Sequence, residues 1–287
     1  RLAHALALGA SRAAVPAIVR TGHISAAKSI ANALIAQSGV QAALFAEAGL
    51  TGPSAILDDP RGLRELFAQD RLSILTAPMA GDGAIMRSHV KAYPCINTGQ
   101  SAIAAALKLH AMLDGPAEDL DRIEIVMADY PVIKRQQDDE GRTRPQSREA
   151  ADHSFPFLVA VTLIDGAFGI AQFDRERWRD PRVNALMEKI IMRRDPEWTM
   201  RAPGSFPCML YAQTRRGRAF TSEVSYPPGF SKDGIGETPA IEKFHAVTAP
   251  HLRESARSQI VDAVMEFHHS RSTIALDSAI GIEGTIP

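Results

Sequence analysis

Three places in the sequence carry a charged or titratable side chain among neighbours that favour a binding site. The first is Lys28, one of seven lysines beside 25 arginines, in a predicted helix. Its helical neighbours Ala31, Asn32 and Ile35 include small side chains, which let other elements approach closely. An ammonium group in such a pocket can hold a carboxylate as a point charge. The alternative is an ordinary lysine at a helix edge, with its stem along apolar surface.

The second place is Lys91, in the segment His89–Cys95 (HVKAYPC). A strand-like run that ends at Tyr-Pro ahead of a helix places Lys91 near a helix N-terminus, which favours anions. The alternative is an exposed lysine on a strand. Both alternatives stay open on the pattern alone.

The third place is the segment Asp152–Pro156 (DHSFP). Proline in the first helical turn puts His153 and Ser154 just outside a helix N-terminus. Backbone N–H groups, a hydroxyl and an imidazole then converge where a carboxylate can bind. The histidine can also move protons, because its ordinary pKa is about 6.5. The alternative is a capping Ser or Asp beside a structural histidine.

Composition and missing motifs exclude several classes of function. The 287 residues include 45% hydrophobic and 23% charged residues, as in a folded globular protein. The 32 basic and 33 acidic residues nearly cancel, which argues against nucleic acid or anionic lipid as a partner. We find no phosphate-binding loop, dinucleotide fingerprint, nucleophile elbow or zinc motif, and we expect no metal or cofactor. His268 and His269 are adjacent and would point about 100° apart on a helix, which argues against a metal ion shared between them.

The cellular location follows from the cysteines and from the absence of targeting signals. Cys95 and Cys208 are too few for a disulfide framework, which favours a reducing compartment. No signal peptide and no uninterrupted apolar stretch of about 18 residues is present, so we expect a cytoplasmic protein without a membrane partner.

Helical periodicity dominates both ends of the chain. A long helix is predicted from about 26 to 48, capped by Ser25 and ended by Gly49. Its apolar spacing predicts a buried face. The members of that face are Ile30, Leu34, Gln41, Leu44, Phe45 and Ala48. A short helix is predicted from Pro60 to Phe67, and two further helices begin at Pro239 and Pro250. The tail 271–287 shows no clear period.

The middle of the chain reads as mixed helix and strand. Strands are predicted at 122–127, 208–213 and 219–225, the last two joined by a hairpin turn at Arg216-Gly217. Residues 84–96 suit strand and loop, and 134–149 suit an exposed loop. Helices are predicted at 101–113, 156–164 and 181–193.

This order predicts an all-α domain with a smaller α+β domain inserted. The expected boundaries are 1–80 for a helical domain, incomplete at its N-terminus, 81–235 for the α+β domain, and 236–287 for C-terminal helices that return to the helical domain.

Several blocks, in order, resemble the MmgE/PrpD family. They are 38–44 (SGVQAAL), 49–57 (GLTGPSAIL), 91–95 (KAYPC), 150–155 (AADHSF) and 226–229 (YPPG). The resemblance covers about residues 24–250. The family includes 2-methylcitrate dehydratase, cis-aconitate decarboxylase and iminodisuccinate epimerase, and its helical plus α+β fold agrees with the order above.

The resemblance implies cofactor-independent chemistry on a small di- or tricarboxylate, in which a proton is moved on a carbon next to a carboxylate. It assigns Lys28, Lys91 and His153 to catalysis, and Lys28, Lys91, Ser154 and Tyr130 to substrate binding. It favours a hydro-lyase like 2-methylcitrate dehydratase, an enzyme of propionate catabolism, acting as a homodimer. An epimerase, a decarboxylase, or a non-catalytic fragment that only associates with a partner are the alternatives.

The chain departs from the family at its start. Family members carry a long helical stretch ahead of the region that matches Lys28, with an aspartate and histidines of the active site. We therefore expect this sequence to be part of a longer polypeptide. Its first helices would then expose an apolar face unless another chain covers it.

Overall fold

A computed structural model of the chain describes residues 1–12, 15–20, 24–57, 59–64, 89–201, 206–230, 236–270 and 272–281. The chain divides into two compact units. Unit 1 takes in Arg1–Met86 and Arg135–Ser154, and unit 2 takes in Arg87–Lys134 and Phe155–Pro287. A mainly helical architecture with one small mixed sheet agrees with the predicted fold class.

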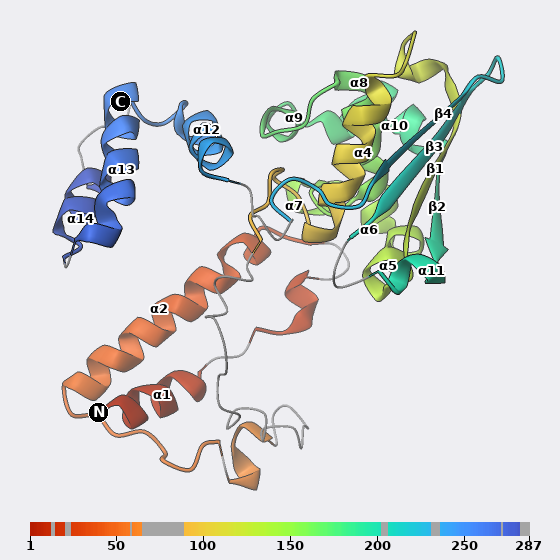
Figure 1. Cartoon of the computed structure of the whole chain (residues 1–287). Helices are drawn as coiled ribbons and strands as arrows, with labels where there is room; N and C mark the ends of the chain where they lie inside the picture. The colour runs from red at the N-terminus through yellow and green to blue at the C-terminus, as the bar shows by residue number, and fades with distance from the viewer. Residues whose placement is uncertain are drawn as a thin grey trace. The chain divides into compact units, whose positions relative to one another are not determined.

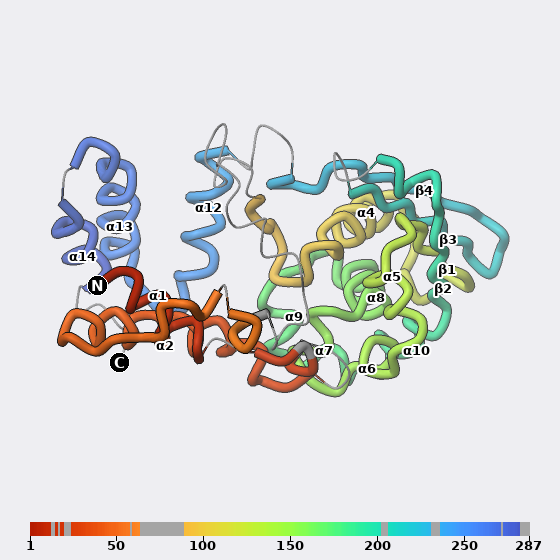
Figure 2. Tube along the Cα trace, turned by 90° about the horizontal axis from the view of Figure 1, so that it is seen from below, coloured from red at the N-terminus to blue at the C-terminus, as the bar shows by residue number. Residues whose placement is uncertain are grey.

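Two helices make up most of the described N-terminal part of unit 1. Helix α1 (Leu2–Ala10) packs along α2 (Ala27–Glu47), as Figures 1 and 2 show. Their contact uses small residues, because Ala7, Ala42 and Ala46 are buried. Helix α2 begins and ends within one residue of its predicted bounds, but its N-cap is Ala26 without a side-chain hydrogen bond, so the Ser25 cap is wrong. Gly49 has a φ of 99°, as the predicted glycine after a helix end requires.

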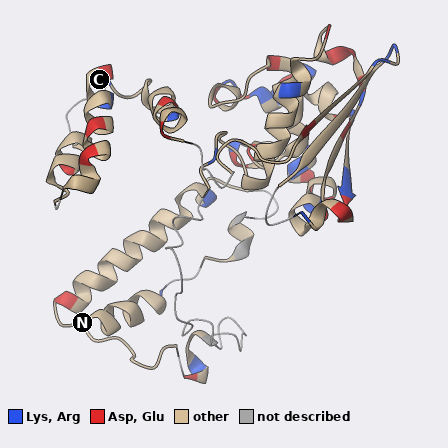
Figure 3. Ribbon diagram, viewed as in Figure 1, with Lys and Arg blue, Asp and Glu red and all other residues tan. Residues whose placement is uncertain are grey.

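The predicted apolar face of α2 is exposed instead of buried. Ile30, Leu34 and Leu44 are 54%, 52% and 57% exposed, and the buried residues of α2 are alanines. Figure 3 shows almost no charge along α2, whose only charged residues are Lys28 and Glu47. By length and composition alone α2 is apolar enough to cross a membrane, a property shared by core helices of soluble proteins. The exposed face agrees with the expectation from the family resemblance.

Unit 1 also holds short helical segments. They are the 3₁₀ turn Ala17–Arg20, the turn Pro60–Arg64, α6 (Glu140–Thr143) and α7 (Arg148–Ala151), while α5 (Pro131–Asp138) crosses the boundary between the units. The exposed loop predicted for 134–149 is therefore wrong. The polar residues there cap helices: the Asp139 carboxylate accepts the Gly141 N–H at 2.9 Å, and the Ser147 hydroxyl accepts the Ala150 N–H at 3.2 Å. The predicted helix 60–67 is described only to residue 64.

Unit 2 contains a four-stranded mixed sheet with strand order β2-β1-β3-β4 (Figure 1). Strand β1 (Leu120–Ala128) pairs in parallel with β2 (Ile190–Asp195) and antiparallel with β3 (Cys208–Thr214), which pairs antiparallel with β4 (Ala219–Val224). The hairpin between β3 and β4 is confirmed, with Gly217 at a φ of 83°. The helix predicted for 181–193 ends early, because its second half pairs with β1 as strand β2.

Helices pack onto this sheet and onto one another. Helix α4 (Gln100–His110) contacts β3, β4 and α8 (Phe155–Asp165), and α8 contacts α10 (Pro181–Met187), which confirms the helices predicted near these positions. Figure 1 shows α4, α8 and α10 on one side of the sheet. Unit 2 also contains short helical segments: Asn97–Gly99, Ala117–Asp119, α9 (Ala171–Asp174), Arg177–Arg179 and α11 (Pro196–Thr199). In the region predicted as strand and loop, residues 89–96 form no strand, and 84–88 lie outside the described residues.

The described residues after 236 form three helices. They are α12 (Glu237–Thr248), α13 (Glu254–Glu266), followed by the turn Phe267–His269, and α14 (Ile274–Ile280). Helix α13 packs against α12 and α14. The tail, which showed no clear period in the sequence, thus contains a helix. The return of these helices to the first helical segment and the expected domain boundaries stay predictions.

Candidate functional site

Lys28, Asp152 and His153 form one contact group in unit 1, here called the Lys28 cluster. The Lys28 Nζ donates to Asp152 Oδ1 at 3.2 Å and to Oδ2 at 3.1 Å, and lies 3.0 Å from His153 Nδ1. The same Nδ1 is in hydrogen-bond contact with Asp152 Oδ1. The structure thus brings together two of the predicted catalytic residues, which are 125 positions apart.

The segment between α7 and α8 places the acid and the imidazole beside Lys28. Lys28 lies in the first turn of α2, and Asp152 and His153 directly follow α7. Ser147 joins the two regions, because its hydroxyl donates to the Ile24 carbonyl at 3.2 Å and also caps α7. The segment ahead of α2 and the start of α7 are therefore held together by a contact outside the cluster.

The cluster is mostly shielded from water. The side chains of Lys28, Asp152 and His153 are 19%, 27% and 14% exposed. Burial lowers the pKa of the His153 imidazole, the Asp152 carboxylate raises it, and the charges of Lys28 and Arg142 lower it further. A lowered pKa keeps the imidazole neutral near pH 7, the form in which it can accept a proton.

Arg142 of α6 is a second cation in this part of unit 1. Its side chain is 6% exposed, its Nε lies 3.9 Å from Asp139 Oδ2, and Nε and Nη1 make no hydrogen bond within the described part of the chain. Burial lowers the pKa of its guanidinium, while the charges of Asp139 and Asp152 raise it. The Arg142 carbonyl accepts a hydrogen bond from the Ser154 hydroxyl, which ties α6 to the residue after His153.

Ser154 and Tyr130, both predicted to bind substrate, lie in different units. The Ser154 side chain is fully buried and its hydroxyl is bonded to the Arg142 carbonyl, a contact that supports the fold. Tyr130 is half-buried after β1 and lines a small hollow with Ile133 and Phe206. Their substrate-binding roles stay predictions.

Lys91 belongs to unit 2, in the turns ahead of α4. Its Nζ donates to the Cys95 carbonyl at 2.9 Å, and its own carbonyl accepts from Lys243 Nζ. Gln100, at the start of α4, is fully buried and holds Tyr93 in place. Its side-chain oxygen accepts from the Tyr93 N–H at 3.0 Å, and its side-chain nitrogen donates to the Tyr93 carbonyl at 2.9 Å. The Lys91 ammonium has no carboxylate partner among the described residues.

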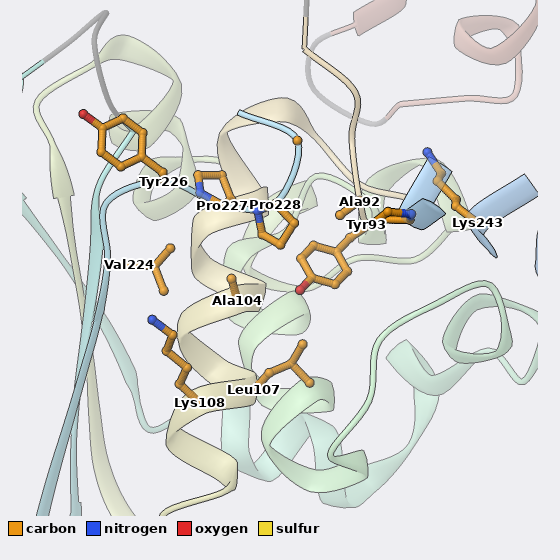
Figure 4. Close-up of a pocket in the computed structure, with 12 residues that line it drawn as sticks. Ala92, Tyr93, Ala104, Leu107, Lys108, Val224, Tyr226, Pro227, Pro228 and Lys243 are labelled. Atoms are coloured by element: carbon orange, nitrogen blue, oxygen red, sulfur yellow. The ribbon is translucent and has the colours of Figure 1, made fainter. Parts of the chain in front are cut away.

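A pocket of about 660 Å³ lies next to this turn, within unit 2 (Figure 4). Figure 4 shows Tyr93 and Pro228 facing each other across it, with Lys108 of α4 on another side. The lining joins Ala92 and Tyr93 with residues 226–229, two of the blocks that carried the family resemblance. Burial raises the pKa of the Tyr93 hydroxyl, so it stays protonated as a hydrogen-bond donor.

Metal ligands do not cluster in the described ranges. No group of three or more His, Cys, Asp or Glu side chains there has the arrangement of a metal site. The rings of His268 and His269, in the turn after α13, are tilted by 42° with centroids 3.7 Å apart, so they do not diverge as expected for adjacent helix residues.

Two residues of the site escaped the sequence analysis as site residues. Asp152 was read only as part of a helix cap, although its position directly before His153 was a usable signal. Arg142 lies in the segment predicted as an exposed loop, and nothing in its neighbours indicated burial.

Comparison with known proteins shows the family. Residues 1–74 match the MmgE/PrpD N-terminal domain and residues 93–267 match the MmgE/PrpD C-terminal domain. The chain therefore belongs to the MmgE/PrpD family, which confirms the resemblance seen in the sequence.

Curated relatives include two kinds of lyase. The chain is 25% identical to cis-aconitate decarboxylase of Mus musculus over 268 residues, covering 89% of this chain and 52% of the relative. It is 26% identical to 2-methylcitrate dehydratase of Salmonella typhimurium over 243 residues, covering 79% of this chain and 48% of the relative. The chain thus spans about half the length of these relatives.

Proposed function

We propose that the protein is a cofactor-independent hydro-lyase that dehydrates a small tricarboxylate such as 2-methylcitrate. The observation that supports this most is the Lys28 cluster in a chain of the MmgE/PrpD family, since it places a neutral imidazole beside a cation and a carboxylate.

The proposed reaction breaks a C–H bond next to a carboxylate and a C–O bond on the neighbouring carbon. A base takes the proton, the electron pair of the C–H bond forms the double bond, and hydroxide leaves as water after it receives a proton. A proton next to a carboxylate is very weakly acidic, so the developing charge needs cations and hydrogen-bond donors nearby. In this proposal His153 is the base and Lys28 binds a substrate carboxylate, while the substrate-binding role of Lys91 is taken from the family resemblance alone.

The Lys28 contacts set a condition on substrate binding. Asp152 already occupies the Lys28 ammonium with both carboxylate oxygens. A substrate carboxylate must therefore share Lys28 with Asp152, using a third N–H of the ammonium. Lys28 can therefore bind one oxygen of the substrate, and the other carboxylates of a tricarboxylate need other cations.

An ultraviolet assay tests the proposal. Full-length gene product mixed with 2-methylcitrate is expected to raise the absorbance, because a conjugated double bond forms. Lys28→Met is expected to lower kcat/KM by roughly 100-fold, the loss of one charged stabilising contact. Lys134→Met, which removes an exposed lysine of α5, is the matched control and is expected to match wild type. No absorbance change with any citrate-like acid would contradict the dehydratase.

Decarboxylation is the second candidate, favoured by the similarity to cis-aconitate decarboxylase. Release of carbon dioxide from cis-aconitate, without dehydration of 2-methylcitrate, would identify it. Loss of optical rotation without a gain in absorbance would instead identify an epimerase. A full-length protein that shows none of these activities would support a non-catalytic role.

A further inference from the structure

One nitrogen of His153 faces two partners of opposite character. His153 Nδ1 contacts Asp152 Oδ1, an acceptor, and lies 3.0 Å from Lys28 Nζ, a donor. A neutral imidazole carries a hydrogen on one ring nitrogen only, so Nδ1 either donates to Asp152 or accepts from Lys28. These are the two tautomers of the neutral imidazole: Nε2 is an acceptor in the first and a donor in the second.

The tautomer decides what His153 can do. With the hydrogen on Nδ1, Nε2 carries a free electron pair and can act as a base. With the hydrogen on Nε2, that nitrogen can only donate. Within the described residues Nε2 has no hydrogen-bond partner, so nothing there competes for it.

We propose that Asp152 is a positioning residue that accepts the Nδ1 hydrogen of His153 and so leaves Nε2 free as the base. This inference rests on the proposed function and deepens it. The hydrogen-bond inventory favours it, since a carboxylate has about four acceptor sites and can accept from Lys28 and His153 together. Lys28 already donates to both Asp152 oxygens, at 3.1 and 3.2 Å, and does not need Nδ1 as an acceptor.

The surroundings of His153 disfavour the protonated imidazole on balance, because burial and the nearby cations outweigh Asp152. After Nε2 takes a proton from carbon, Asp152 stabilises the imidazolium through the Nδ1 hydrogen bond. Lys28 of α2 and Arg142 of α6 oppose it, and Asp139 offsets part of the Arg142 charge at 3.9 Å. The imidazolium can then return the proton from Nε2 to the departing hydroxide, which leaves as water. His153 ends neutral, and the atoms and charges of the elimination balance.

Nitrogen-15 NMR of the histidine side chains in the full-length protein tests the tautomer without substrate. His153→Gln identifies the His153 signals by their loss. We expect the wild type to carry the hydrogen on Nδ1. In Asp152→Asn the side-chain amide can donate to Nδ1 instead, so we expect the hydrogen on Nε2. A wild type with the hydrogen on Nε2, or an unchanged tautomer in Asp152→Asn, overturns the proposal.

Kinetics separates positioning from a structural role. Asp152→Asn is expected to lower kcat by roughly 100-fold or more, while KM changes less than about threefold. Asp152→Glu, which restores the acceptor, should recover part of kcat. Asp138→Asn, at an exposed position of α5, is the matched control. Equal kcat for Asp152→Asn and wild type refutes the role. If the tautomers are as expected but no lyase activity is found, the proposed function fails while the Asp152–His153 pairing stands.

Discussion

The buried hydroxyl of Ser154 gives a quantitative test of the site's framework. Its side chain is fully buried and donates to the carbonyl of Arg142, which links α6 to the segment that carries His153. Ser154→Ala removes this donor and leaves a buried carbonyl with less hydrogen bonding. The expected cost is about 2 kcal/mol, within the range for an unsatisfied buried polar group.

Ser11 provides the matched control for this change. Its hydroxyl also donates to a main-chain carbonyl, that of Leu8 at 2.8 Å, but the residue is exposed. Water replaces the lost donor in Ser11→Ala, so the free energy of unfolding should change by less than about 0.5 kcal/mol. The difference between the two variants isolates the contribution of burial.

Thermal unfolding followed by circular dichroism measures both variants. At roughly 2–4 °C per kcal/mol for a chain of this size, Ser154→Ala should lower Tm by about 4–8 °C, and Ser11→Ala by less than about 2 °C. KM for the carboxylate substrate should stay near that of wild type. An unchanged Tm together with a strongly raised KM would refute the structural role and support the substrate contact predicted from the family resemblance.

Two further predictions concern a helix end and a titrating group. Gly166→Ala should lower the free energy of unfolding, measured with denaturant, by about 2 kcal/mol or more, because φ is 64° and a Cβ would lie 2.4 Å from His110 Nε2. Gly169→Ala is the control and should lower it much less, because a Cβ there would meet nothing within 4 Å. Equal losses in the two variants would contradict this reasoning. Since the folded-state pKa of His153 is lowered, the unfolded chain binds its proton first, so wild-type Tm should fall as pH drops below about 6.5. His153→Gln should lack that part of the fall, and parallel pH curves for the two proteins would show the shift to be absent.

Local signals explain the parts of the fold that the sequence predicted. The hairpin follows from a turn dipeptide between alternating strands, and Gly49 marks the end of α2 because a φ of 99° suits glycine. Strand β2 was missed because Ile190–Asp195 continues the polarity pattern of α10, and only its pairing with β1, more than 60 positions away, makes it a strand. Strand β1 was found although its partners are as distant, because its own residues alternate.

In the candidate site, too, single residues were predictable from their own segments, whereas the contacts between them depend on the fold. His153 and Lys28 were found because each stands in a distinctive segment, and the family resemblance then joined them. Their 3.0 Å contact depends on the end of α7 lying at the start of α2, which no spacing reveals. Arg142 was missed because its burial depends on the whole fold of the segment 135–154.

The apolar side of α2 needs a different explanation. Periodicity predicted a buried face, but the described residues leave this face exposed, since Leu34 and Leu44 are more than half exposed. A periodic pattern shows which residues are apolar enough to be buried. It does not show which other residues cover them.

Exchange of hydrogen at carbon tests the central claim, that His153 in the Lys28 cluster moves a proton next to a carboxylate. Full-length protein and 2-methylcitrate are incubated in D₂O, and deuterium in the recovered acid is measured by mass spectrometry. Wild type and His268→Gln should incorporate deuterium at the same rate. His153→Gln should be slower by roughly 100-fold or more. Equal incorporation by wild type and His153→Gln would contradict the account.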